Sequence, residues 1–238
     1  MFKIALDAGH GMNTPGKRCL KALDANETRE WWLNNRICVA LEKKLLNYDG
    51  YSLIRVDDTT GVSDVSLGNR VKKANTYGAD IYVSIHHNAG INGGSGGGAM
   101  VLIDTTGSAK SAEYQKLIYE EFIKQTGLKG NRTAPMPRQS LYVCKHTKMP
   151  AVLIEGGFMD SKTDVPIILS DNFANKAAEA LLNVLVKTGK LTKKANTVTN
   201  TEPSGKLYRV QVGAYSVKAN AEEMLKKLKA DGYDGFIV

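Results

Sequence analysis

Two adjacent histidines end an otherwise apolar run in the segment VSIHHNAG, residues 83–90, where their imidazole nitrogens could bind a metal. His86 and His87 are half of the four histidines in the chain. Successive side chains of a strand point to opposite faces, so both rings cannot easily bind one metal ion. We therefore expect one ligand from this pair, and we expect His87 to be a pocket or core residue.

Three other groups with metal-binding or acid–base chemistry lie at the end of an apolar run or at the start of a helical pattern. His10 lies between two glycines in DAGHG, Glu30 begins the inward-facing stripe of a helix, and Glu155 ends the apolar run PAVLIE. A buried carboxylate is costly unless it is paired, binds a metal or takes part in catalysis. Two imidazoles and one carboxylate would leave a coordination position of zinc open for water, and a further glutamate would serve as base.

The elements that must position these groups alternate along the chain. The predicted strands are residues 2–8, 51–56, 79–88, 99–104, 141–144 and 150–158. The predicted helices are residues 30–47, 66–76, 110–126 and 171–187. This order predicts an α/β fold with a mainly parallel central sheet flanked by helices. Such sheets bind ligands at the carboxyl ends of their strands, where His10, His86 and Glu155 fall.

Composition divides the chain further. We expect a catalytic domain over residues 1–188, a linker over 189–206, which is polar and rich in Thr, Asn and Lys, and a small unit over 207–238. The glycine-rich segment INGGSGGGAM, residues 91–100, lacks the Lys-Ser/Thr ending of a phosphate-binding loop. We expect it to form a flexible loop at the rim of the sheet.

The segments DAGHG, EWWLNNRICVALEKKL, SLGNRVKKAN, SIHHNA and PAVLIEGGFMDS, taken together, resemble the zinc-dependent N-acetylmuramoyl-L-alanine amidases of the Amidase_3 type. These enzymes occur in bacterial autolysins, sporulation hydrolases and phage endolysins. The resemblance covers about residues 1–187. It implies cleavage of the amide bond between N-acetylmuramic acid and the L-alanine of the stem peptide. It also implies a Zn2+ ion held by His10, Glu30 and His86, with Glu155 as the catalytic glutamate.

Other residues near these motifs have open interpretations. Glu27 would replace Glu30 if the helix began one turn earlier, and Asn88 would either cap a loop or donate a hydrogen bond beside the site. The pair at 31–32, both Trp, could stack on sugar but is more often packing. Exposed positions are expected for Arg70, Lys145 and His146.

Residues 207–238 show strand alternation, a helix and a final strand, and they resemble one half-repeat of a SPOR-type peptidoglycan-binding domain. The apolar face of the helix comprises Ala221, Met224, Leu225 and Leu228. A βαβ unit of this size buries too little apolar surface to be stable alone. We therefore expect two tails to pair in a homodimer. The alternative is a tail that packs on its own amidase domain or is disordered.

Charge and termini suggest partners and location. The formal net charge of +8 favours a polyanionic partner, and the resemblance points to peptidoglycan and anionic wall polymers rather than to nucleic acid. We expect no membrane insertion, because no long apolar span exists. The opening MFKIALDAGHG lacks the features of a secretory signal peptide. We therefore expect synthesis in the cytoplasm and access to the wall after lysis or by a holin-like route.

Three widely separated cysteines, Cys19, Cys38 and Cys144, predict free thiols rather than a disulfide framework. Two alternative functions stay open. A zinc exopeptidase of related architecture would use the same kind of site. A non-catalytic wall-binding protein would be expected to lose one of the four site residues, and all four are present.

Overall fold

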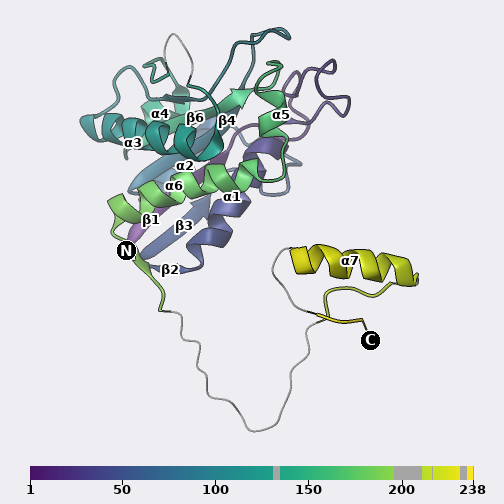
Figure 1. The fold of residues 1–238 in the computed structure, drawn as a ribbon. Coiled ribbons are helices and arrows are strands. Elements are labelled where there is room, and N and C mark those ends of the chain that lie inside the picture. The colour runs from purple at the N-terminus through teal and green to yellow at the C-terminus, as the bar shows by residue number, and fades with distance from the viewer. Residues whose placement is uncertain (131–134, 196–210, 216, 231–234, 238) are drawn as a thin grey trace. The chain divides into compact units, whose positions relative to one another are not determined.

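The computed structural model describes residues 1–130, 135–195, 211–215, 217–230 and 235–237. Internal contacts divide the chain into two units, Met1–Ala195 and Asn196–Val238, and each is described by itself (Figure 1). Within the described ranges, no helix is both long enough and apolar enough to cross a membrane.

The first unit is built on a five-stranded sheet with the strand order β3-β1-β4-β6-β5. Its parallel strands are β1 (Phe2–Ala8), β3 (Tyr51–Arg55), β4 (Ile81–Asn88) and β6 (Ala151–Phe158). Only β5 (Met100–Leu102), at one edge, runs antiparallel to its neighbour. The mainly parallel sheet predicted from the sequence is confirmed.

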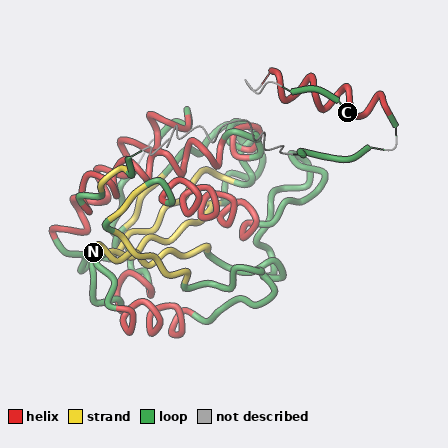
Figure 2. Tube along the Cα trace, turned by 90° about the horizontal axis from the view of Figure 1, so that it is seen from below, coloured by secondary structure: helices red, strands yellow, loops and turns green. Residues whose placement is uncertain are grey.

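Helices cover both faces of this sheet, as Figure 2 shows from below. One face carries α1 (Glu30–Leu45), α3 (Ala109–Thr126) and α6 (Phe173–Gly189), and the other carries α2 (Leu67–Tyr77) and α4 (Tyr142–His146). A short helix, α5 (Val165–Ile168), follows β6. The flanking helices predicted from the sequence are thus present.

Side-chain alternation along β4 decides which core each residue joins. Ile81, Val83 and Ile85 lie in the large apolar cluster with α1, α3 and α6, whereas Tyr82 lies in the smaller cluster with α2 and α4. All four side chains are fully buried. A strand covered on both faces reads as a mainly apolar run, and the buried hydroxyls of Tyr82 and Ser84 within it both donate to the Asp7 carboxylate.

One predicted strand is wrong. Residues 141–144 were expected to be extended, but the structure has α4 beginning at Tyr142. The Asp104 carboxylate accepts a hydrogen bond from the backbone N–H of Leu141 at 3.2 Å, just before the helix. The rings of Tyr142 and His146 stack at 4.2 Å, a contact that the four-residue spacing of a helix provides. Local packing therefore favours the helical turn over an extended run.

The first unit also extends further along the chain than the predicted catalytic domain. Residues 192–193 form β7 (Thr192–Lys193), which pairs with β2 (Tyr48–Asp49) in a small antiparallel sheet. Leu191 is buried against the large cluster. The predicted linker begins at residue 189, whereas the structure continues the first unit to Ala195.

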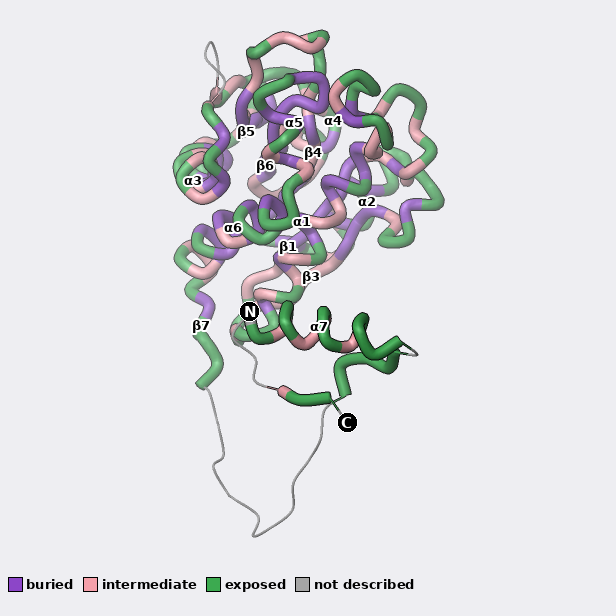
Figure 3. Tube along the Cα trace, turned by 45° about the vertical axis from the view of Figure 1, so that its right-hand side comes forward, coloured by how far each residue is buried: buried purple, intermediate pink, exposed green. Residues whose placement is uncertain are grey.

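The second unit contains α7 (Lys218–Ala230), which overlaps the predicted helix of the tail. The helix is mainly exposed, and its half-buried positions include Ala221, Met224, Leu225 and Leu228 (Figure 3). Of the predicted first strand, residues 207–210 lie outside the described residues and residues 211–215 have no regular secondary structure. Residues 231–234 and 238, around the predicted final strand, lie outside the described residues as well.

Candidate metal centre

Four polar side chains converge where the parallel strands end. His10 follows β1 by two residues, His86 lies near the end of β4, and Glu155 is the register partner of His86 on β6. Glu30 is the first residue of α1. The sequence-predicted site residues, which are up to 145 positions apart, are thus brought to one edge of the sheet.

The backbone at His10 is unusual and leaves room for a second ring. His10 has a φ of +66°, in the left-handed region that residues with a side chain seldom adopt. A Cβ atom at the preceding Gly9 would overlap the imidazole of His86. The DAGHG segment therefore needs glycine at position 9 for a steric reason, and the two imidazoles meet edge to face with ring centroids 4.9 Å apart.

Three of the four side chains present donor atoms suited to one metal ion. Ligand atoms of His10, Glu30 and His86 all lie within 4.8 Å of one another. Glu30 Oε1 lies 3.4 Å from His10 Nε2 and 3.0 Å from His86 Nδ1. Glu30 Oε2 is buried and accepts no hydrogen bond from the described residues, and the ammonium of Lys17 lies 3.7 Å from it. Two imidazole nitrogens and a carboxylate are a donor set that fits zinc.

Glu30 and His86 each stabilise the charged form of the other. Burial alone would raise the pKa of Glu30, but its hydrogen bonds with His10 and His86 outweigh burial and hold the pKa well below the ordinary value. Burial alone would lower the pKa of His86, yet its hydrogen bond with Glu30 and the nearby carboxylates raise it. The glutamate is therefore ionised, as a metal ligand must be.

Glu155 occupies a different electrostatic setting. Its Oε2 is buried and has no hydrogen-bond partner among the described residues. Burial, with a contribution from the charge of Glu30, raises the pKa of Glu155 to about 7, although His86 and Lys17 act in the opposite direction. A carboxyl group with a pKa near neutrality can both accept and return a proton. The arrangement thus pairs a metal-binding cluster with a candidate general base.

His87 points away from this cluster, as strand alternation predicts. Its Nδ1 lies 2.8 Å from Asn34 Oδ1, and the amide nitrogen of Asn34 donates to the Gly9 carbonyl at 3.1 Å. Asn34 Oδ1 must therefore accept, so His87 carries its proton on Nδ1. The ring also packs 6.0 Å from that of Phe173, and burial lowers the pKa of His87 to about 4. His87 is a neutral core residue in the structure.

Asn34 lies in the segment EWWLNNRICVALEKKL, and the structure gives it a role. It lies four residues after Glu30 on the same face of α1 and links His87 to the turn before His10. The four-residue spacing from Glu30 already indicates that Asn34 lies on the same face of the helix. The partners of Asn34, which are His87 on β4 and Gly9 just after β1, could not be predicted from the sequence.

The remaining alternatives fall outside the cluster. Glu27 forms an ion pair with Arg18 at 3.1 Å. Asn88 caps its own loop by accepting from the backbone N–H of Ala89 at 2.8 Å. Trp31 is buried and packs on Gly61, so it is not a sugar-stacking surface. The other three candidates, Trp32, Lys145 and His146, are exposed and lie outside the cluster.

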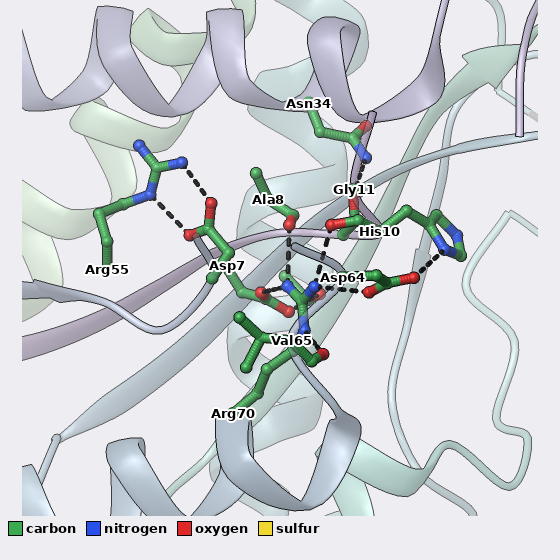
Figure 4. Close-up of polar contacts among 12 residues, drawn as sticks. Asp7, Ala8, His10, Gly11, Asn34, Arg55, Asp64, Val65 and Arg70 are labelled. Carbon is green, nitrogen blue, oxygen red and sulfur yellow. Dashed lines mark hydrogen bonds and ion pairs between the residues drawn. The ribbon is translucent and has the colours of Figure 1, made fainter. Parts of the chain in front are cut away.

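The expectation of an exposed Arg70 is wrong. Its side chain is 1% exposed and is among the largest fully buried side chains of the described residues. The guanidinium pairs with Asp7 beneath the sheet edge, and Figure 4 shows it also reaching the backbone of Ala8 and His10. Arg70 supports the site from behind rather than contacting solvent.

The glycine-rich segment is more firmly held than a flexible rim. Asp160 Oδ2 accepts hydrogen bonds from the backbone N–H groups of residues 90–92 at 2.7–2.8 Å. Asp164 Oδ2 accepts from Gly98 at 2.6 Å. The sequence reading missed both aspartates, although they follow the site strand directly in FMDSKTD. The loop is therefore anchored at both ends to the turn after β6.

Comparisons with known proteins found similar sequences and similar folds. The sequence model of N-acetylmuramoyl-L-alanine amidases matches residues 4–187, and that of the SPOR domain matches residues 174–238. The chain is 34% identical over 241 residues to the sporulation-specific N-acetylmuramoyl-L-alanine amidase of Bacillus subtilis, covering all of this chain and 85% of that protein. It is 30% identical to the endolysin of Bacillus phage SPP1, over 78% of this chain and 68% of that protein.

Solved structures show the same fold. The CwlD amidase from Clostridioides difficile, in complex with the GerS lipoprotein, superposes with a TM-score of 0.68 at 25% identity, covering 80% of this chain and 98% of that one. The catalytic domain of CwlV, an N-acetylmuramoyl-L-alanine amidase from Bacillus (Paenibacillus) polymyxa, gives a TM-score of 0.69 at 22% identity, covering 79% of this chain and 98% of that one. The latter likeness concerns the fold alone.

Proposed function

The chain belongs to the N-acetylmuramoyl-L-alanine amidase family, and on that premise we propose that His10, Glu30, His86 and Glu155 form its reaction site. The family's reaction makes the chain a peptidoglycan hydrolase that cleaves the amide bond between N-acetylmuramic acid and the L-alanine of the stem peptide. One observation carries the assignment of residues: donor atoms from a strand tip, a helix start and a glycine turn lie within 4.8 Å of one another.

Zinc is the metal that this donor set supports. Two histidines and a glutamate are a ligand combination of catalytic zinc sites, which keep a further position for water or substrate. When bound, zinc would supply Lewis acidity, which would lower the pKa of water and polarise an amide carbonyl. His10, Glu30 and His86 would hold the ion. Gly9 would leave the space that His86 needs in order to share it.

Glu155 is the proton carrier in this proposal. Its carboxylate takes a proton from the attacking water, and the resulting carboxyl group gives that proton to the nitrogen of L-alanine as the C–N bond breaks. An amide nitrogen leaves poorly without a proton, so the second transfer is as necessary as the first. Two features of Glu155 support both transfers: its buried Oε2 has no hydrogen-bond partner among the described residues, and burial raises its pKa to about 7.

The basic surface and the second unit suggest how the enzyme stays at the wall. A formal net charge of +8 suits stem-peptide carboxylates and anionic wall polymers. The SPOR match supports glycan binding by the tail, and the half-buried apolar stripe of α7 supports pairing of two tails. Delivery by lysis or by a holin-like route remains a prediction from the sequence.

Zinc content and product analysis test the proposal together. His10→Ala, Glu30→Ala and His86→Ala should each be purified without zinc and without activity, because each removes a ligand. His146→Ala is the matched control, an exposed histidine that should keep both. On purified walls, the wild type should release amino termini of L-alanine while the glycan stays intact. Zinc retained by all three ligand variants would refute the site, and release of single amino acids would favour an exopeptidase.

A further inference from the structure

Asp64 lies between the cluster and the buried guanidinium of Arg70, in the loop before α2. The two carboxylate oxygens of Asp64 face different partners. Oδ1 accepts from Arg70 Nη2 at 3.0 Å, whereas Oδ2 accepts from the Thr14 hydroxyl at 2.7 Å and lies 4.0 Å from His10 Nδ1 (Figure 4). Asp64 therefore offers one oxygen to the scaffold and one toward the His10 ring.

The ring of His10 thus has a carboxylate beside each of its nitrogens. Nε2 faces Glu30 Oε1 in the metal-binding cluster, at 3.4 Å, and Nδ1 faces Asp64 on the opposite side. A histidine that binds a metal through one nitrogen almost always donates its other N–H to a carboxylate, a carbonyl or water, and this bond fixes both the tautomer and the ring orientation. The Asp64 carboxylate lies on the side of the ring where that acceptor belongs.

Arg70 ties the backbone of His10 to the same carboxylate. Its Nη2 donates to the His10 carbonyl at 3.0 Å as well as to Asp64, and its Nη1 donates to the Ala8 carbonyl at 2.9 Å. The left-handed backbone of His10 is therefore held by the group that also holds Asp64. A buried arginine with its donors engaged in this way does not shift easily, so the backbone of His10 and the Asp64 carboxylate stay close together.

A third contact closes the arrangement. The hydroxyl of Thr14 donates to Asp64 and accepts from the backbone N–H of Gly11 at 2.9 Å. The turn that carries His10 and the loop that carries Asp64 are therefore joined on both sides of the ring, by Arg70 and by Thr14.

We propose that Asp64, held by Arg70 and Thr14, is a positioning residue that accepts the Nδ1–H of His10 and so presents Nε2 to the metal. The inference rests on the proposed function, since it takes His10 as a ligand. The 4.0 Å between Asp64 Oδ2 and His10 Nδ1 is longer than a hydrogen bond, and the proposal is that it closes to one in the zinc-loaded enzyme. The competing explanation is that Asp64 only anchors its loop.

Asp64→Asn separates these two roles. The aspartate serves three donors, from Arg70, Thr14 and His10, whereas an asparagine offers a single acceptor oxygen and adds two donors. The substitution therefore keeps the size and shape of the side chain but removes one acceptor oxygen. We expect zinc affinity, measured by competition with a chelator, to fall roughly tenfold to a hundredfold. In the wild-type zinc-loaded protein, the Nδ1–H proton of His10 should be visible by NMR and exchange slowly with water, whereas in the variant it should exchange rapidly.

Three further variants complete the design. Glu120→Gln removes one exposed carboxylate on α3 and should leave zinc affinity and the His10 proton unchanged. Thr14→Ser keeps the hydroxyl and should behave as wild type, whereas Thr14→Val should weaken zinc binding in the same direction as Asp64→Asn. Thermal unfolding of each zinc-free variant shows whether the loop itself has been disturbed.

The outcomes separate this inference from the function on which it rests. If His10→Ala lacks zinc while Asp64→Asn binds zinc with wild-type affinity and retains the slowly exchanging Nδ1 proton, the positioning role is refuted and the ligand set stands. If His10→Ala retains zinc, the ligand set fails and the role of Asp64 fails with it. A lowered unfolding temperature with unchanged zinc affinity would identify Asp64 as a loop anchor.

Discussion

At the scale of single residues, a missing side chain decides where His86 can lie. Because a Cβ at position 9 would overlap the imidazole of His86, Gly9→Ala should displace that ring. We expect the variant to be folded but to lose zinc, which elemental analysis of the purified protein would show. Gly68→Ala is the control, since its added methyl group would meet no atom closer than 3.8 Å. Full zinc occupancy in Gly9→Ala would contradict the steric account.

The role of Glu155 predicts a separation of metal binding from turnover. Glu155→Gln keeps the size of the side chain and one acceptor oxygen but cannot take a proton. Zinc content should stay at the wild-type level, and the release of amino termini from walls should fall by a factor of about 10² to 10⁴. The assay is colorimetric detection of new amino groups. Near-normal release by this variant would remove Glu155 from the mechanism.

From the sequence we could propose the site residues that lie in a recognisable local motif. Supporting residues whose partners lie far away along the chain were missed. His10, Glu30, His86 and Glu155 stand at the ends of patterned segments, and the family resemblance assigned their roles, which the tests above address. Arg70 has no such signature, because it looks like the other polar residues of its helix and its partner Asp7 lies 63 positions earlier inside a strand. The burial of Arg70 depends on its ion pair with Asp7, and residues near Arg70 in the sequence do not indicate such a distant partner.

At the scale of elements, the anchored glycine-rich loop makes its own prediction. Asp160→Ala removes the carboxylate that accepts from three part-buried backbone N–H groups at residues 90–92, and loss of hydrogen bonds to a charged acceptor costs about 1.5–3 kcal/mol of unfolding free energy. We expect hydrogen exchange of these amides to accelerate while the strands stay protected. Asp171→Ala, which changes an exposed aspartate, should leave both measurements unchanged. Slow exchange in Asp160→Ala would mean that other contacts hold the loop.

Most elements were predictable because their patterns are long. Strands β1, β4 and β6 are apolar runs of seven or eight residues, and α1, α3 and α6 repeat apolar side chains over several turns. The segment at 141–144 offers too few residues to distinguish a strand from a helical turn. Its conformation is set by Asp104 and by ring stacking, neither of which a four-residue window contains.

At the scale of the whole molecule, the tail predicts a change in mass. If two tails pair through the apolar stripe of α7, the full chain should be a dimer at tens of micromolar by light scattering. A version that ends at Ala195, where the first unit ends, should be monomeric and still cleave walls. Met224→Glu within the stripe should also give monomers, whereas Lys226→Glu on the exposed side should not. A monomeric full chain would refute the pairing.

The three cysteines are unpaired, and burial raises the pKa of Cys19 and of Cys144 to about 12 and that of Cys38 further. Thiols react mainly as thiolates, so these groups are nearly inert to oxidants at neutral pH. We therefore expect the molecule to keep the same covalent structure under reducing and under oxidising conditions. Its activity should therefore need neither an oxidative folding catalyst nor a reductant.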